Sequence, residues 1–416
     1  MVNKQRTVKA WWSRLAGRIK YIAGSKIGRA GAGVVVVLLV FTVGVNVGNG
    51  RIHFASFSGD NRNLPSQLNY TSVNQVYNLI KDNYDGHLTA NQLLDGMKAG
   101  LAAATGDPYT EYFNAAQAQQ LNEQLNGSFG GIGAQLGTNS QGSLEIIAPV
   151  AGTPAAKAGL QPGDLITSIN GHQTTGMPVD TAVNDIRGPA GTTVTLGILR
   201  GTQSLTLRIT RAVITVPSVT WKILSGHIGY MQISQFTNDT GSLAQQAAQA
   251  FKKQGVKGIV LDLRDNPGGE VSAAVSVSSL WLPTNTLIMQ EKHGSTVLQT
   301  YRSSGNDILK GIPTAILVNG GTASAAEITT GALMDNHAAY VIGTTTFGKG
   351  VVQEIFGLSN GGELKVTVAH WYRPDGQNIN HKGITPNQTV KMTSAQAQAG
   401  QDPQEAAAIQ WLQQHG

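Results

Sequence analysis

A run of 21 uncharged residues between Arg29 and Arg51 restricts the fold of this chain more than any other feature. The run includes the apolar stretch 34–41. Its length matches a bilayer core of about 30 Å at about 1.5 Å per helical residue. We therefore expect a transmembrane helix over residues 30–50, between a basic segment (1–29) and a linker (51–65). A buried core helix is the plainer alternative.

The charges beside this run predict its orientation. Eight Lys and Arg precede it, and basic flanks remain cytoplasmic, so the rest of the chain is expected outside the cytoplasm. A cleaved signal peptide is the nearer rival. Its hydrophobic region is usually shorter, and no convincing small-x-small cleavage site is visible. We favour a retained single-pass anchor, which makes the membrane the first expected partner.

The net charge of +6 comes from the N-terminal segment. Residues 1–59 hold nine of the 30 Lys and Arg and no acidic residue, which leaves 21 basic against all 24 acidic residues in the remainder. The body of the protein is therefore not basic, and a nucleic-acid partner is excluded. The chain has no cysteine, so disulfides, thiolate metal sites and a cysteine nucleophile are excluded too.

Three segments with different residue patterns follow the linker. Residues 66–126 are predicted to be helical, with an amphipathic 3–4 spacing and a break at 106–108. The apolar positions of that spacing are Val73, Val76, Tyr77 and Ile80. From Gly127 short β-branched runs and turn glycines predict a β-rich domain over 127–212. Its expected strands are 144–147, 165–169, 194–199 and 205–209, and its expected helices are 154–158 and 178–186.

Beyond residue 212 the pattern changes again. Short apolar runs alternate with helix-like stretches over 213–392, which predicts an α/β domain with a mainly parallel sheet. The runs are 259–263, 315–318 and 340–342. Residues 393–416 are expected to form a tail, with a terminal helix over 401–415.

The β-rich segment opens on a glycine cluster that includes Gly130, Gly131, Ile132 and Gly133. Such a loop lets successive backbone N–H groups converge on an anion. Glycine clusters are more often only turns, but three further stretches follow in order: 151–166, 169–171 and 186–201. Together they closely resemble PDZ domains. The resemblance implies a groove that adds a peptide strand to a sheet edge, and a glycine loop that binds the peptide's terminal carboxylate.

The third segment carries a candidate nucleophile. No Ser-x-x-Lys and no His-Glu-x-x-His motif occurs, and the nine histidines form no metal-spaced cluster. An apolar strand ends at Val318, a glycine turn follows, and a helix is expected to begin near Ser324. An N-cap is the plainer role for this serine, because Ser324 and Glu327 match a capping box.

Two further stretches supply a candidate general base and candidate oxyanion donors. Lys349 stands between two glycines, and Gln353 follows at a distance suited to orienting its amine. A surface lysine is the usual case, but burial lowers a lysine pKa and makes a neutral base available. The turn around Gly268 and Gly269 follows an apolar strand, and its N–H groups could point at a developing oxyanion.

These stretches, in this order behind a PDZ domain, resemble the carboxy-terminal processing peptidases, or tail-specific proteases. The resemblance covers about residues 66–392 and includes the sequences 106–109 and 383–386. It implies a crotonase-like α/β protease core without metal or organic cofactor. Ser324 would be the nucleophile, Lys349 the general base and Gln353 its orienting partner. The oxyanion hole would use the N–H of Ala325 and one of Gly268 or Gly269.

The chain departs from the family at a few positions. Thr322 and Ala326 stand where the family is often serine-rich, and Asn387 stands where aspartate is frequent. The expected substrates are exported proteins or peptides with free C-termini. A non-catalytic binding protein or a PDZ scaffold without turnover is the rival, and neither needs both Ser324 and Lys349. The natural substrate, an activating adaptor and the oligomeric state stay open, with the terminal helices as candidates for a homodimer interface.

Overall fold

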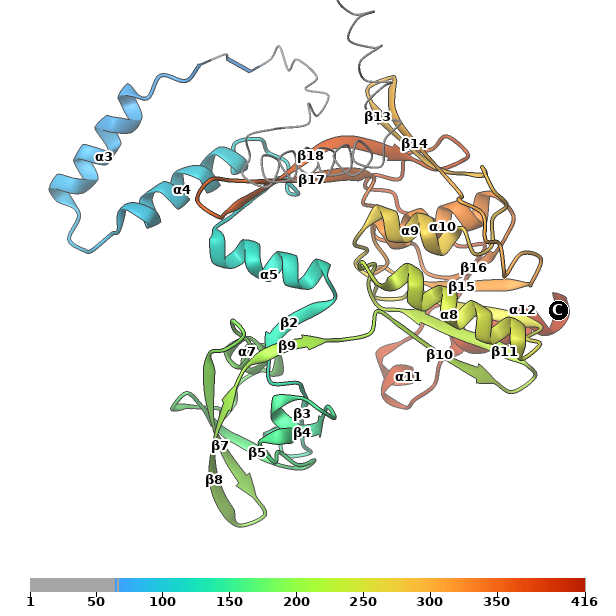
Figure 1. The fold of residues 1–416 in the computed structure, drawn as a ribbon, viewed down its shortest axis with the longest axis horizontal. Coiled ribbons are helices and arrows are strands. Elements are labelled where there is room, and N and C mark those ends of the chain that lie inside the picture. The colour runs from blue at the N-terminus through green and yellow to red at the C-terminus, as the bar shows by residue number, and fades with distance from the viewer. Residues whose placement is uncertain (1–63, 66, 416) are drawn as a thin grey trace, which may run out of the picture. The chain divides into compact units, whose positions relative to one another are not determined.

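A computed structural model of the chain describes residues 64, 65 and 67–415 (Figure 1). The expected transmembrane helix over 30–50 and the basic segment before it lie outside the described residues. Within the described part, none of the helices combines the length and the apolar character that a bilayer crossing needs. The chain divides into two compact units, residues 1–94 and 95–416.

The first unit includes α3 (Thr71–Asn83) and the start of α4 (Ala90–Ala103). The helical prediction for this stretch is confirmed. The amphipathic positions of this stretch are not buried among the described residues: α3 buries none of its residues, and Val76 and Tyr77 are exposed. The described residues of this unit are two short helical stretches joined by a loop, which enclose too little volume to form a core among themselves.

The second unit continues with β1 (Glu111–Phe113) and α5 (Ala115–Leu125). The predicted break at 106–108 separates α4 from this pair. Asn114 begins α5 with a full capping box, in which Asn114 and Gln117 exchange side chain–backbone hydrogen bonds of 3.0 Å. Strand β1 was not predicted; its partner is β18, far along the chain.

The PDZ segment forms the predicted β-rich domain. Its main sheet has the order β3-β4-β5-β7-β8, so β3 is an edge strand, and β2 pairs with β9 outside this sheet. A separate core of aliphatic side chains, including Ile146, Ile169 and Leu196, fills it. The elements are β2 (Ser128–Gly131), β3 (Ala134–Thr138), β4 (Leu144–Pro149), α6 (Pro154–Lys157), β5 (Leu165–Ile169), β6 (His172–Gln173), α7 (Val179–Ile186), β7 (Thr193–Arg200), β8 (Gln203–Thr210) and β9 (Ala212–Thr215).

The α/β segment is built on a six-stranded sheet with the order β10-β11-β12-β15-β16-β19. All of its pairs are parallel except β10 with β11, which confirms a mainly parallel sheet. The strands are β10 (Val219–Leu224), β11 (Ile228–Ile233), β12 (Gly258–Asp262), β15 (Thr314–Val318), β16 (Tyr340–Gly343) and β19 (Gln388–Thr389).

Helices bury both faces of this sheet. One face contributes Ile259, Leu261 and Ile316 to a core shared with α8 (Thr240–Lys253), α9 (Val271–Ser278) and α10 (Ala325–Asp335). The other face packs against α12 (Pro403–His415), which follows the short α11 (Ser394–Gln398). Successive residues of β12 therefore alternate between two cores, and this explains why the strand reads as a continuous apolar run.

A second, antiparallel sheet was not predicted. It has the order β1-β18-β13-β14, and β17 also pairs with β18. Its strands are β13 (Leu287–His293), β14 (Thr296–Arg302), β17 (Val351–Gly357) and β18 (Glu363–Tyr372). Most of their residues are only partly buried. Half-buried strands have weaker apolar patterns than the buried strands of the parallel sheet, so they are harder to predict from sequence.

Candidate active site

Ser324 lies at the end of the turn that joins β15 to α10, immediately before the first helical residue, Ala325. Its backbone has φ 52° and ψ −117°, a conformation that side-chain-bearing residues rarely adopt. The predicted strand–turn–helix arrangement is therefore present, with a strained residue at its apex. Ser324 and Glu327 form the capping box expected from the sequence. The hydroxyl acts there as an acceptor, so its own proton remains available to a base.

A second serine lies in a Gly-x-Ser-x-Gly sequence, the pattern of a nucleophile elbow, at residues 357–361. These residues form the hairpin turn between β17 and β18, where Gly361 N–H donates to the carbonyl of Leu358 at 3.0 Å. No helix follows this turn, so Ser359 has none of the geometry of a nucleophile elbow.

Glu327 connects the Ser324 turn to the Lys349 loop. Its buried carboxylate accepts hydrogen bonds from the backbone N–H of Ser324 at 2.9 Å and from the Thr346 hydroxyl at 2.6 Å. It also accepts from the N–H groups of Gly348 and Lys349 at 2.7 and 3.0 Å. Burial raises the pKa of Glu327, while these four hydrogen bonds oppose the rise. The sequence indicated only the contact with Ser324; the other three depend on tertiary structure.

Lys349 is partly buried just before β17. Burial lowers the pKa of its ammonium group, and nearby Lys365 lowers it further, against the opposing effects of Glu327 and Asp107. Its Nζ lies 5.2 Å from the centre of the Tyr109 ring. Among the described residues, no hydrogen bond joins this Nζ to Ser324 Oγ or to Gln353. The amide of Gln353 instead donates to Thr367 Oγ1 at 3.2 Å.

Two backbone N–H groups near Ser324 are free of partners within the described chain: those of Ala325 and Gly269. The N–H of Gly268 is occupied, since it donates to Asn266 Oδ1 at 2.8 Å. Gly268 nevertheless lies against the serine, because a Cβ placed on it would be 2.7 Å from Ser324 Cβ. Of the two glycines left open by the sequence, Gly269 is thus the one with an available donor.

These groups line one cavity of about 410 Å³. Ser324, Lys349, Gln353, Gly268 and Gly269 all contribute to its wall. The rest of the lining is mostly apolar and comes from α5, α9, α10 and the antiparallel sheet: Leu121, Leu125, Val271, Ile328, Val351, Val352, Ile355 and Trp371. The structure therefore brings the predicted catalytic residues together around a space that can accept a peptide segment.

The glycine loop of the PDZ segment is arranged differently from the prediction at Gly130 and Gly131. Gly131 is the last residue of β2 and pairs with Ala212 of β9, so it belongs to a sheet and not to an open loop. Gly130 N–H donates to the carboxylate of Glu123 at 2.9 Å, so it is already engaged. The carbonyls of Ile132 and Gly133 accept from Ala155 and Val150. Their own N–H groups have no backbone partner in the described chain and lie just before the edge strand β3. Helix α7 packs beside this strand.

Comparisons with known proteins agree with this architecture. The model described as Peptidase family S41 matches residues 227–390, and the PDZ domain model matches residues 120–199. A probable CtpA-like serine protease of Staphylococcus epidermidis (strain ATCC 35984) is 36% identical over 338 residues, which are 80% of this chain and 68% of that protein. A protein of the same description from Staphylococcus aureus (strain bovine RF122) is 38% identical and covers 79% of this chain and 66% of its own length.

Two solved structures are similar as well. A photosystem II D1 C-terminal processing protease is 27% identical with a TM-score of 0.47, and the match covers 78% of this chain and 87% of that one. A putative S41 protease from Bacteroides fragilis NCTC 9343 is 18% identical with a TM-score of 0.50 over 79% and 92% of the two chains. The second likeness concerns the fold alone.

Proposed function

This chain belongs to peptidase family S41, among the PDZ-containing C-terminal processing peptidases, and is a serine-type peptidase; from this premise we propose a Ser324–Lys349 dyad that cuts proteins near their C-termini. The observation that carries the proposal is the shared cavity, in which Ser324 and Lys349 face the same space. Glu327 binds the backbones of both residues and thereby fixes the distance between their loops.

The chemistry follows from the two groups. Neutral Lys349 takes the proton of Ser324 Oγ as the oxygen attacks the scissile carbonyl carbon. The resulting ammonium returns that proton to the leaving amine as the peptide C–N bond breaks, which leaves an acyl-enzyme. Water then attacks the ester with Lys349 again as base, and releases the acid and the free serine. A lowered lysine pKa supplies the neutral amine that the first step needs.

The dyad must close before it can act. A general base works within about 2.6–3.2 Å of the proton it removes, and catalytic hydrogen bonds often tighten only in the substrate complex. Here Nζ lies near the Tyr109 ring. We infer that substrate binding turns it toward Ser324, and that Gln353 then orients it. The N–H groups of Ala325 and Gly269 receive the oxyanion.

The PDZ segment selects the substrate in this proposal. A peptide C-terminus adds to the open edge of β3 beside α7, and its carboxylate accepts from the free N–H groups of Ile132 and Gly133. Val179 and Val183 lie one turn apart on α7 and are half buried, which suits an apolar terminal side chain. The occupied N–H of Gly130 takes no part while Glu123 holds it.

We further propose that residues 30–50 anchor the protein in the membrane with the peptidase outside the cytoplasm. The basic residues before residue 30 support this orientation. Protease added to intact spheroplasts should digest the catalytic part. Protection that persists until the membrane is lysed would reverse the orientation.

The central test uses the detergent-solubilised full chain with a peptide that carries either a free or an amidated C-terminus. Ser324→Ala and Lys349→Ala should each abolish hydrolysis of both peptides. The wild type should cut the free acid with the higher kcat/KM. Turnover by Ser324→Ala would overturn the dyad, and equal cutting of the two peptides would overturn tail recognition while leaving the peptidase.

A further inference from the structure

We propose that Asp265 and Asn319 are positioning residues that lock the oxyanion-hole turn (263–269, the oxyanion turn) to the turn that presents the serine (319–324, the nucleophile turn). The inference rests on the proposed function, because it assigns these residues a role in orienting its oxyanion donors. The two turns follow different strands, β12 and β15, so backbone continuity alone does not fix the position of one relative to the other.

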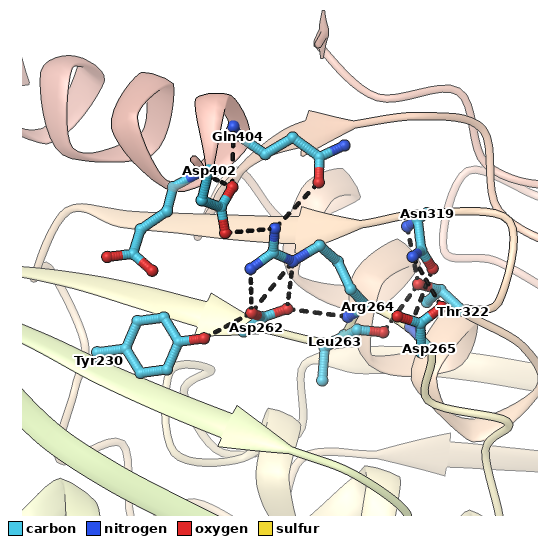
Figure 2. Close-up of polar contacts among 10 residues, drawn as sticks. Tyr230, Asp262, Leu263, Arg264, Asp265, Asn319, Thr322, Asp402 and Gln404 are labelled. Atoms are coloured by element: carbon cyan, nitrogen blue, oxygen red, sulfur yellow. Dashed lines mark hydrogen bonds and ion pairs between the residues drawn. The ribbon is translucent and has the colours of Figure 1, made fainter. Parts of the chain in front are cut away.

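A reciprocal pair of hydrogen bonds joins the turns (Figure 2). Asp265 N–H donates to Asn319 Oδ1 at 2.9 Å, and Asn319 Nδ2 donates back to Asp265 Oδ1 at 2.9 Å. The same Asn319 oxygen accepts from Gly321 N–H at 3.0 Å, so this one side chain also shapes its own turn. Asp265 has φ 56°, a costly conformation for a residue other than glycine.

Buried contacts continue this connection toward the serine. Thr322 Oγ1 donates to the carbonyl of Leu263 at 2.8 Å, and Ala323 N–H donates to the carbonyl of Asn266 at 2.9 Å. Gly321 leaves no spare room between the turns: a Cβ placed there would lie 2.9 Å from Asp265 Cα and 2.8 Å from its Oδ1. The turns therefore touch along their length, from the exposed Asp265 to Ser324.

The neighbouring Arg264 points to the other side of the turn (Figure 2). It pairs with Asp262 at 2.6 Å and with Asp402, at the start of α12, at 2.8 Å. Tyr230 donates to the same Asp262 carboxylate at 2.6 Å. These contacts fix the end of β12 to the sheet and to α12. They do not reach the nucleophile turn. The position of the oxyanion turn relative to Ser324 therefore depends on the Asp265–Asn319 pair and on the buried contacts between the turns.

The two oxyanion donors make this position important for the rate. Gly269 N–H belongs to the oxyanion turn, whereas Ala325 N–H follows the nucleophile turn. Preorganised donors stabilise a transition state only while both point at the same oxygen. A misplacement of about 1 Å can lower a rate by roughly a hundredfold. A shift between the turns should therefore reduce kcat more than KM, since the PDZ groove and the apolar wall of the cavity are unchanged.

Two adjacent glycines provide a matched test. Gly321→Ala inserts a methyl group against Asp265, whereas Gly320→Ala places the same group in open space. Neither residue has the positive φ that would strain alanine. With a peptide substrate in the full-length chain, we expect Gly321→Ala to lower kcat by about 10- to 100-fold at nearly unchanged KM. Gly320→Ala should stay within about twofold of wild type.

A side-chain exchange tests the pair itself and does not depend on how well Gly321→Ala folds. Asn319→Asp removes the donor and places two carboxylates against each other, so kcat should fall by about fivefold or more. Asp265→Asn keeps an acceptor for Asn319 and is the second single variant of the exchange, against which the double variant is compared. The double variant Asp265→Asn/Asn319→Asp restores a donor and an acceptor in exchanged positions, and it should recover most of the lost kcat.

The outcomes separate this inference from the proposed function. If the wild type cuts peptide and Ser324→Ala does not, but the two glycine variants behave alike and the exchange gives no rescue, the positioning role is wrong and the dyad stands. A loss in Asn319→Asp that appears equally in KM, or only as a lower melting temperature, would also refute positioning. If Ser324→Ala remains active, the proposed function itself fails.

Discussion

Replacing Ser324 by glycine should abolish activity and yet stabilise the protein relative to Ser324→Ala. A non-glycine residue with φ 52° and ψ −117° stores about 1–3 kcal/mol of backbone strain. Alanine keeps the Cβ and with it the strain. Glycine releases it, at a cost of about 0.5–1 kcal/mol for its greater freedom in the unfolded chain. Losing the half-buried Cβ costs about 0.4 kcal/mol more, from about 0.8 for a fully buried methylene.

Together these contributions should make the free energy of unfolding of Ser324→Gly about 1 kcal/mol higher than that of Ser324→Ala. In a segment of this size, that difference raises the melting temperature by about 2–4 °C, which differential scanning calorimetry resolves. Ala323→Gly is the matched control, because Ala323 adjoins the serine but has no positive φ. It should lose about 1.3–1.8 kcal/mol, of which about 0.5–1 comes from the freedom of glycine in the unfolded chain and about 0.8 from the buried methyl group of Ala323.

The sign of the stability difference between Ser324→Gly and Ser324→Ala shows whether the backbone at this position is strained. If Ser324→Gly is less stable than Ser324→Ala by the amount that Ala323→Gly loses, the serine is unstrained. The conformation would then not be evidence of a residue held in place for chemistry. Both serine variants should in any case show no hydrolysis and no labelling by a serine-reactive probe.

Four further predictions concern the dyad, its support and the tail site. Lys349→Arg should be as inactive as Lys349→Ala, because arginine stays protonated. The wild-type kcat should rise with pH as the lysine, whose pKa is lowered by burial, loses its proton; a flat profile from about pH 6 to about pH 9 would contradict a titrating base. Glu327→Gln leaves at least two buried donors without an acceptor, so urea unfolding should show a loss of about 2–6 kcal/mol, together with a lower kcat. Gly133→Ala, at φ 75° and with a Cβ only 2.5 Å from Thr153, should raise KM for a free-acid peptide toward the value for its amide while serine-probe labelling persists.

The sequence predicted the elements whose patterns are strong and local. Strand β5 has the predicted bounds 165–169, and the three predicted parallel strands differ from β12, β15 and β16 by at most one residue at either end. Their apolar runs are unmistakable because both faces of the sheet are buried. The resemblance to the processing peptidases likewise named Ser324 and Lys349 as candidates, and both line one cavity.

Features that depend on distant partners could not be predicted in this way. The antiparallel sheet pairs β1 with β18, and its half-buried strands carry no clear period. The apolar spacing on α3 indicated an amphipathic helix, but none of the described residues covers that face. A helical pattern shows which side can be buried, while burial itself needs a second surface.

The same division applies to the site. The residue types and their order were determined by the sequence: a serine after a strand, a lysine between glycines, and a glycine turn. Which N–H group is free was decided by the folded chain. The N–H of Gly268 is occupied locally, by Asn266 two residues before it, whereas the N–H of Gly130 is occupied by Glu123 of the preceding helix. A backbone donor is present at every non-proline residue, so only the folded chain determines which donors stay unpaired and where they point.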